Sequence, residues 1–289
     1  MPRLGSFSSK IYFNNPQSSS FSLIKTIANP NAYGVAQDDF FANSVAINSN
    51  YAVIGSIESD ATAAQNGKVY VFSQAGTALY TIDNPTATVA PGLGEGDMYG
   101  RSVGCSASYI IAGAQQEDVG GNSNTGIAYI HDITDGSLLF TLNNPNPTTT
   151  EINPNTDLFG SAVAISENFA AVSSPREDIN GIGDDTGWIF LFDTSDGSLL
   201  RSIENPNIDG EDEYPGDQLG ERIQTLAMND TYTVVGSWRE NTAGASGGGD
   251  SGAIHIITNA TGAVQTILNP NPNGPAIGTD NFDQFGYSV

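Results

Sequence analysis

Residues 157–206 read DLFGSAVAISENFAAVSSPREDINGIGDDTGWIFLFDTSDGSLLRSIENP, and their pattern organises the whole chain. Short runs of β-branched, aromatic and small residues alternate with turn residues, and the runs cover 157–165, 169–175, 187–193 and 197–206. Such runs, bounded by Asn, Asp, Gly and Ser, are typical of β-strands. Because a connection such as Ser195-Asp196-Gly197 suits a tight hairpin, the pattern predicts four antiparallel strands.

The pattern recurs along the chain at intervals of roughly 60 residues. Its opening aspartate stands at Asp39, Asp97, Asp157, Asp217 and Asp283, and its closing Asn-Pro pair begins at 29, 84, 144, 205 and 269. Second strands such as Tyr51-Ala52-Val53-Ile54 are apolar throughout, which indicates small sheets covered on both faces. The sequence therefore predicts an all-β fold: a β-propeller of four-stranded antiparallel blades, with four complete repeats plus partial terminal strands. An open solenoid is disfavoured because its coils are shorter than this period.

The elements Asp-x-Phe-Gly-x-Ser-Val, Tyr-Ala-Val-Ile-Gly-Ser and Gly-x-Val-Tyr-Val-Phe resemble the FG-GAP repeat of integrin α subunits and of many bacterial and viral surface proteins. The resemblance covers about residues 21–289 and implies a β-propeller, but it implies no single activity. The copies depart from the family pattern at Phe41-Ala42, Tyr99-Gly100 and Leu219-Gly220, and the proline of the family's Gly-Ala-Pro occurs only as Pro175.

The repeat boundaries predict the domain organisation. We expect an extended N-terminal tether over 1–20 and a propeller over 21–289, with blades near 31–85, 86–145, 146–206 and 207–270 and the start of a further blade over 271–289. Residues 21–30 match a fourth strand, and an unpaired outer strand is an aggregation hazard. We therefore expect this segment to pair as an outer strand with the blade begun at Asp283 and to close the ring. We also expect the chain to be a fragment of a longer protein.

Charge and composition exclude several classes of partner. The chain has 9 Lys+Arg against 32 Asp+Glu and a net charge of −23, which repels nucleic-acid phosphates and anionic lipids. No apolar run approaches the ~18–20 residues that cross a bilayer, and the N-terminus lacks the apolar core of a secretory signal. We expect no nucleic acid, no membrane insertion and no classical signal peptide.

The residues that usually suggest chemistry occupy packing positions of the repeat. His131, His255 and Cys105 each replace an aromatic or aliphatic residue of the other copies. The recurring aspartate is interpreted as a structural turn residue that accepts backbone N–H groups, followed by an aromatic that fills the blade interface and a glycine with positive φ. We therefore expect no catalytic residues, no enzymatic activity and no cofactor, with calcium as the one exception considered.

One segment has oxygen ligands at alternate positions around glycines: Asp178, Asn180, Asp184 and Asp185. Such a pattern can hold a hard cation. It occurs once, and it does not lie in the connection where FG-GAP proteins carry their cation loop. Calcium is a candidate here, and a solvated loop is the alternative.

Binding is expected at one end of the blades. In a four-stranded antiparallel blade, the connections from the second to the third strand and from the fourth strand to the next blade emerge at the same end, and here these are the long connections. We call this end the long-loop face, because long loops on a rigid scaffold are where binding usually lies. The variable positions there are Gln115, Gln116, Arg176, Trp238 and Arg239. Trp238 is the expected anchor, for which alanine should cost about 2 kcal/mol of affinity; a tryptophan that caps the end of a blade is the alternative.

The sequence favours a non-catalytic binding or structural propeller displayed on a virus particle, as part of a tail, fibre or capsid appendage. The opening Met1-Pro2-Arg3-Leu4-Gly5-Ser6 is similar to the starts of some marine phage virion proteins. The partners would be other virion proteins or a host surface protein or glycan. A bacterial secreted or cell-surface adhesin is the alternative. A glycan-cleaving enzyme or a quinoprotein is less favoured, the latter because Phe140 and Arg201 follow the turn where quinoprotein repeats continue into a tryptophan docking motif.

Overall fold

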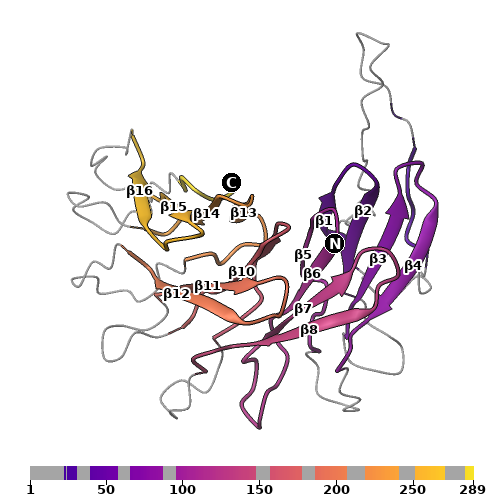
Figure 1. Cartoon of the computed structure of the whole chain (residues 1–289), viewed down its shortest axis with the longest axis horizontal. Coiled ribbons are helices and arrows are strands. Elements are labelled where there is room, and N and C mark those ends of the chain that lie inside the picture. The colour runs from indigo at the N-terminus through magenta and orange to yellow at the C-terminus, as the bar shows by residue number, and fades with distance from the viewer. Residues whose placement is uncertain are drawn as a thin grey trace, which may run out of the picture.

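The computed structural model is a row of four β-sheets (Figure 1). It describes residues 23, 25–30, 40–57, 66–86, 96–147, 157–177, 186–206, 219–240, 251–270 and 284–289. Every named element within these residues is a β-strand. No helix of the described chain has the length and apolar character needed to cross a membrane.

Each sheet contains four antiparallel strands in chain order, and we number the sheets one to four. The first consists of β1 (Phe41–Ile47), β2 (Tyr51–Ser56), β3 (Lys68–Ser73) and β4 (Ala78–Asp83). The second consists of β5 (Ser102–Cys105), β6 (Tyr109–Ala114), β7 (Ile127–Asp132) and β8 (Leu138–Asn143). The third consists of β9 (Val163–Ile165), β10 (Phe169–Ser174), β11 (Trp188–Asp193) and β12 (Leu199–Glu204). The fourth consists of β13 (Leu226–Met228), β14 (Tyr232–Ser237), β15 (Ala253–Thr258) and β16 (Val264–Leu268).

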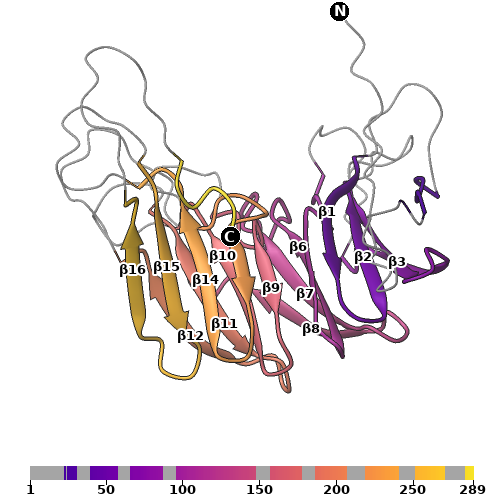
Figure 2. The same cartoon turned by 90° about the horizontal axis from the view of Figure 1, so that it is seen from above.

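The sheets are arranged as the blades of a propeller. The first strands of successive sheets contact one another, whereas the fourth strands β4, β8, β12 and β16 lie at the outer edge (Figures 1 and 2). Exposed leucines such as Leu79, Leu139 and Leu200 mark this outer edge. The predicted all-β propeller fold with four blades is confirmed, and the first strand of each blade is innermost as expected.

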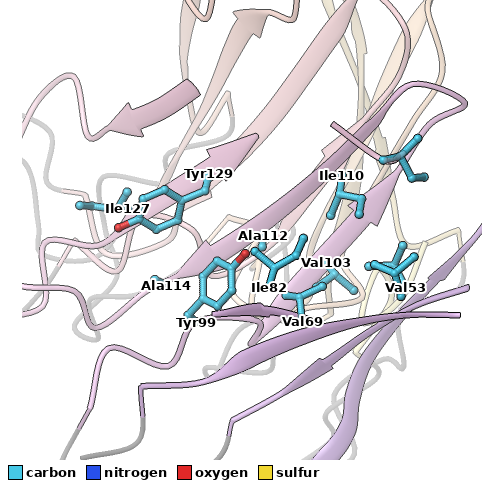
Figure 3. Packing of buried hydrophobic residues seen from close by; sticks show 12 residues of the cluster. Val53, Val69, Ile82, Tyr99, Val103, Ile110, Ala112, Ala114, Ile127 and Tyr129 are labelled. Carbon is cyan, nitrogen blue, oxygen red and sulfur yellow. The ribbon is translucent and has the colours of Figure 1, made fainter. Parts of the chain in front are cut away.

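The hydrophobic core lies between neighbouring sheets. Val53 and Val69 of the first sheet meet Ile110 and Tyr129 of the second (Figure 3). Equivalent clusters join the second sheet to the third and the third to the fourth. Ile110 belongs to the first of these clusters and Ile111 to the next, because successive side chains of a strand point to opposite faces. This two-sided burial explains why the second strands are apolar throughout.

In the second and third repeats the Asp-x-aromatic-Gly segment forms a turn before the first strand, whereas we expected it to begin that strand. In the third repeat, Leu158 and Gly160 have φ angles of 53° and 93°, and β9 begins only at Val163. Positive φ values lie outside the β region; in the first repeat, where β1 begins at Phe41, Ala42 has a φ of 65° and the strand register is irregular there. Phe159 is 0% exposed, as expected for an aromatic that fills the blade interface. A Cβ on Gly160 would lie 2.7 Å from the carbonyl oxygen of Ile127, so this turn requires glycine.

Residues 25–30 lie beside the first sheet. Ile27 packs against the core residues on the side of this sheet that faces away from the second sheet. Lys25 lies over Gly76 of the β3–β4 turn, where a Cβ would be 2.7 Å from Lys25 Cδ. Tyr80 of β4 lies over Gly136 of the second sheet in the same way. The segment therefore occupies the place of a fourth strand of a preceding blade, as its sequence indicates.

The expected ring closure is not formed within the described residues. We expected 21–30 to pair as an outer strand with the blade begun at Asp283, but the described part of this segment has no strand conformation. Residues 284–289 lie instead against the fourth sheet, where Phe285 bridges Gly252. The two segments thus flank opposite ends of the row. In each sheet the fourth strand pairs with the third, and residues 284–289 form the turn that precedes a first strand, so the pairing stays a prediction.

Candidate binding site at the long-loop face

The two ends of the blades are built differently. At one end, short turns such as that between β7 and β8 are fixed locally: Asp132 Oδ1 accepts the Thr134 N–H at 2.7 Å, and Gly136 has a φ of 77°. The other end is the long-loop face, and the middles of most of its connections lie outside the described residues. So do Asp39, Asp217, Asp283 and the candidate calcium ligands Asp178, Asn180, Asp184 and Asp185. Elsewhere in the described chain, no group of three or more His, Cys, Asp or Glu could hold a metal.

A trio of Asn, Asp and Glu links successive blades beside this face. Asn144 follows β8, and its Nδ2 donates to Asp157 Oδ2 and Glu177 Oε2 of the next blade, both at 2.9 Å. The corresponding trio between the first and second sheets is Asn84, Asp97 and Glu117. Asp157 and Asp97 are therefore buried at blade interfaces. We had not predicted the glutamate, although its recurrence at 117, 177 and 240 was a signal that could have identified it.

Burial perturbs these glutamates strongly. Glu177 is 0% exposed, and its Oε1 atom has no hydrogen-bond partner among the described residues. Desolvation by burial, with a smaller contribution from the Asp157 charge, raises the pKa of Glu177 to about 8. Burial likewise raises the pKa of Glu117 to about 7. At neutral pH Glu177 therefore favours the protonated form, whereas Glu117 is about equally protonated and ionised.

Gln115, an expected contact residue, is buried instead. Its side chain is part of a network in which Arg101 Nε and Ser161 Oγ donate to Gln115 Oε1, at 2.9 and 3.0 Å. Only 8% of Gln115 is exposed. The Gln115 oxygen accepts hydrogen bonds from Arg101 in its own blade and from Ser161 in the next blade. Gln115 therefore positions Arg101, and its oxygen is not free to bind a partner.

Trp238 is also packed, which corrects its expected role as an exposed anchor and agrees with the alternative of a cap. The residue is 5% exposed, and its indole Nε1 donates to Glu221 Oε2 at 2.8 Å. Arg222 and Arg239 lie over the indole ring, with their guanidinium carbons 5.2 and 4.6 Å from its centre. Trp238 is thus a platform that supports two arginines, an arrangement stabilised by cation–π attraction.

The remaining predicted contacts, Gln116, Arg176 and Arg239, are partly exposed. Gln116 and Arg176 occupy the same backbone position in successive blades, since their N–H groups donate to the carbonyl oxygens of Asp97 and Asp157, both at 3.3 Å. Two side chains of different chemistry are therefore presented from equivalent places on the long-loop face.

The structure adds a set of residues that the sequence prediction missed. Each lies one position after the aromatic-Gly pair, or after its counterpart Phe41-Ala42 in the first copy. These residues are Asn43, Arg101, Ser161, Glu221 and Tyr287. The identity of this position differs in every copy, which is the criterion that had singled out Trp238. In the sequence this position reads as the interior of the first strand, so the pattern does not indicate that it lies in a turn.

The two histidines and the cysteine occupy packing positions, as expected. His131 and His255 are 1% and 0% exposed, and burial lowers the pKa of each to about 4. Burial also raises the pKa of the Cys105 thiol to about 11. At neutral pH all three groups are uncharged.

Comparisons with known proteins gave one sequence-family match and matches to solved structures. The sequence model of the FG-GAP repeat matches residues 31–72. The structure is similar to BamB from Moraxella catarrhalis, with a TM-score of 0.39 and 16% identity over 78% of this chain and 52% of that one. It is also similar to the Neurospora crassa Pan2 WD40 domain, with a TM-score of 0.40 and 8% identity over 78% of this chain and 50% of that one. This chain therefore spans about half the length of each structure. No curated protein sequence matches it.

The chain has the architecture of a β-propeller, built from radially packed four-stranded blades. With the repeat match, the prediction of an FG-GAP-repeat β-propeller is confirmed. These matches do not bear on a phage origin.

Proposed function

We propose that this propeller is a non-catalytic binding module that recognises another protein or a glycan through its long-loop face. One observation carries this proposal: three arginines and a tryptophan lie near one another at the inner end of that face. Arg101 comes from the second blade, and Arg222, Trp238 and Arg239 come from the fourth. Aromatic and arginine residues dominate recognition energetically. The blade cores and turns repeat and form a rigid framework for this cluster. The exposed positions differ between blades, as expected for a recognition surface.

The contact residues are divided into two groups under this proposal. Arg239, Arg176 and Gln116 touch the partner, whereas Gln115 and Trp238 hold neighbouring side chains in position. The buried, neutral histidines support a role in packing and give no support to a catalytic one.

The same proposal includes display on a virus particle, with other virion proteins or a host surface protein or glycan as the partner. Display as an adhesin on a bacterial cell is the alternative. Mass spectrometry of purified particles and of cell-surface fractions from the source material distinguishes the two. Recovery in the particles supports the virion setting, and recovery only with cells contradicts it.

Binding is tested by screening the purified chain against immobilised surface glycans and proteins, then measuring the best binder by biolayer interferometry. Arg239→Ala and Arg176→Ala should weaken binding, because both remove partly exposed side chains of the long-loop face. Asn50→Ala, an exposed change in the β1–β2 turn at the opposite end, is the control. Loss of binding with the Asn50 variant and retention with both arginine variants would place the site at the wrong end of the blades.

A further inference from the structure

Positive charge is scarce in this chain, and a third of it belongs to one group of arginines. The sequence has 9 Lys+Arg against 32 Asp+Glu. Three of the arginines, Arg101, Arg222 and Arg239, gather at the inner end of the long-loop face, and we call them the arginine cluster. Arg222 also lies 5.5 Å from the ring centre of Tyr287, which is 41% exposed.

Among the described residues, Glu221 is the carboxylate that forms ion pairs with arginines of the cluster, and one carboxylate does not neutralise three guanidinium groups. Glu221 Oε2 accepts the Trp238 indole N–H at 2.8 Å. The same oxygen lies 3.7 Å from Arg222 Nε and 3.8 Å from Arg239 Nε, distances that exceed those of good N–H···O hydrogen bonds. Arg222 Nε is a buried donor without a hydrogen-bond partner among the described residues. A buried donor left unpaired is costly, whereas the Arg222 side chain as a whole is 41% exposed and can meet an added anion.

Two arginines of the cluster also act on each other. Arg101 is fixed by its bond to Gln115. Its pKa is lowered by burial and then by the positive charge of Arg222, an effect that Glu221 only partly offsets. Like charges repel each other, and an anion bound near both offsets that repulsion.

We propose that the arginine cluster binds a carboxylate or sulfate group of an acidic glycan, with the sugar ring against Tyr287. Guanidinium groups present forked N–H donors that match planar oxyanions. Tyr287 is 41% exposed, the Arg222 guanidinium lies over its ring, and its ring centre is 5.9 Å from that of Trp238. An acidic sugar supplies an apolar C–H face and an oxyanion in one rigid unit, which fits an aromatic ring next to an arginine better than the flexible side chain of an acidic peptide does.

This inference rests on the proposed function and names the ligand of the same face. The test uses isothermal titration calorimetry at physiological salt with three polymers: dextran sulfate, uncharged dextran as its matched control, and poly-glutamate as the acidic peptide. Polygalacturonate provides a carboxylated glycan, and inorganic sulfate provides the free anion. Binding should be measurable for at least one acidic glycan, weaker for poly-glutamate and absent for dextran. Inorganic sulfate should bind more weakly than the polymer, because it offers nothing to Tyr287.

Arg222→Gln and Arg101→Gln should each weaken acidic-glycan binding about tenfold or more, as expected when a hydrogen bond to a charged group is lost. Lys68→Gln removes the same charge away from the cluster, at the surface pair of Lys68 with Asp83, and should leave affinity within about twofold. Stronger binding of poly-glutamate, equal binding of dextran, or acidic-glycan affinity unchanged in both arginine variants would overturn the inference. If the chain binds a neutral glycan or a protein, and Arg176→Ala abolishes that binding while Arg222→Gln does not, the inference fails and the proposed function stands.

Discussion

Replacing the buried Glu177 by Gln should remove a large alkaline destabilisation of the protein. The carboxyl has an ordinary pKa of 4.5 and a value of about 8 in the folded chain. Because the folded pKa is raised, its contribution to stability is fully present below pH 4.5 and is lost as pH rises through about 8. Over this interval of about 3.5 pH units, at about 1.4 kcal/mol for each unit, the loss is about 5 kcal/mol.

Glutamine keeps the shape of the side chain and removes the ionisation. Its Oε1 can accept the bonds that Asn144 Nδ2 and Ser174 Oγ now donate to Glu177 Oε2, at 2.9 and 3.0 Å. The Glu177→Gln variant should therefore be close to wild type in free energy of unfolding at pH 5. At pH 9 it should be more stable than wild type by several kcal/mol, up to about 5.

The assay is urea denaturation of both chains at pH 5, 7 and 9, followed by circular dichroism. Glu167→Gln is the control, because the pKa of Glu167 is lowered: hydrogen bonds from Ser106 and Ser108 outweigh the raising effect of its slight burial. Its contribution is present above pH 4.5 and is lost on acidification, so this control should not relieve the alkaline loss. An equal difference between wild type and Glu177→Gln at pH 5 and pH 9 would refute the argument.

Three further outcomes are expected. Gly160→Ala should cost about 2 kcal/mol or more of unfolding free energy, because it combines a positive φ with a backbone clash; Gly120→Ala, with a φ of 64° and no atom within 4 Å of the added Cβ, should cost only about 1 kcal/mol in the same denaturation assay. Trp238→Ala should lower the unfolding free energy by about 3–5 kcal/mol, as for other buried aromatics, so a variant that melts at the wild-type temperature would show that Trp238 is not a packing residue. His255 has a pKa of about 4 in the folded chain against 6.5 ordinarily, so its contribution to the unfolding free energy is lost as pH falls from 6.5 toward 4. His255→Phe should therefore flatten the dependence of unfolding free energy on pH in that window. An unchanged slope would contradict a buried, neutral His255.

The repeat allowed most of the fold to be predicted from the sequence. Second strands such as Tyr51-Ala52-Val53-Ile54 need cover on both faces, and radially packed sheets supply it. The glycine of the aromatic-Gly pair was correctly expected to have positive φ. The start of the first strand was placed too early, because alternation in Asp157–Ile165 does not reveal that Leu158 also has positive φ, at 53°.

The candidate site was predicted less well than the fold. Variation between copies predicts binding at the long-loop face, but it could not show which variable side chains are buried. Gln115 and Trp238 are packed because residues of neighbouring chain segments, Ser161 and Glu221, bond to them. The proximity of Arg101 to Arg222, 121 positions apart in the numbering, depends on the curvature of the row of blades, which periodicity alone does not contain.

The contact between each fourth strand and the turn of the next blade bears on how such a chain grows during evolution. In this contact a long side chain lies over a bare glycine, and the pairs are Lys25 over Gly76, Tyr80 over Gly136, Phe140 over Gly197 and Arg201 over Gly262. Since the glycine has no side chain, the same position accommodates a cation, a phenol and a phenyl ring in different copies. At this contact, a duplicated or exchanged repeat therefore needs no matching mutation in its neighbour. Contacts of this kind favour changes in the number of blades by recombination, while the recognition surface of each blade diverges independently.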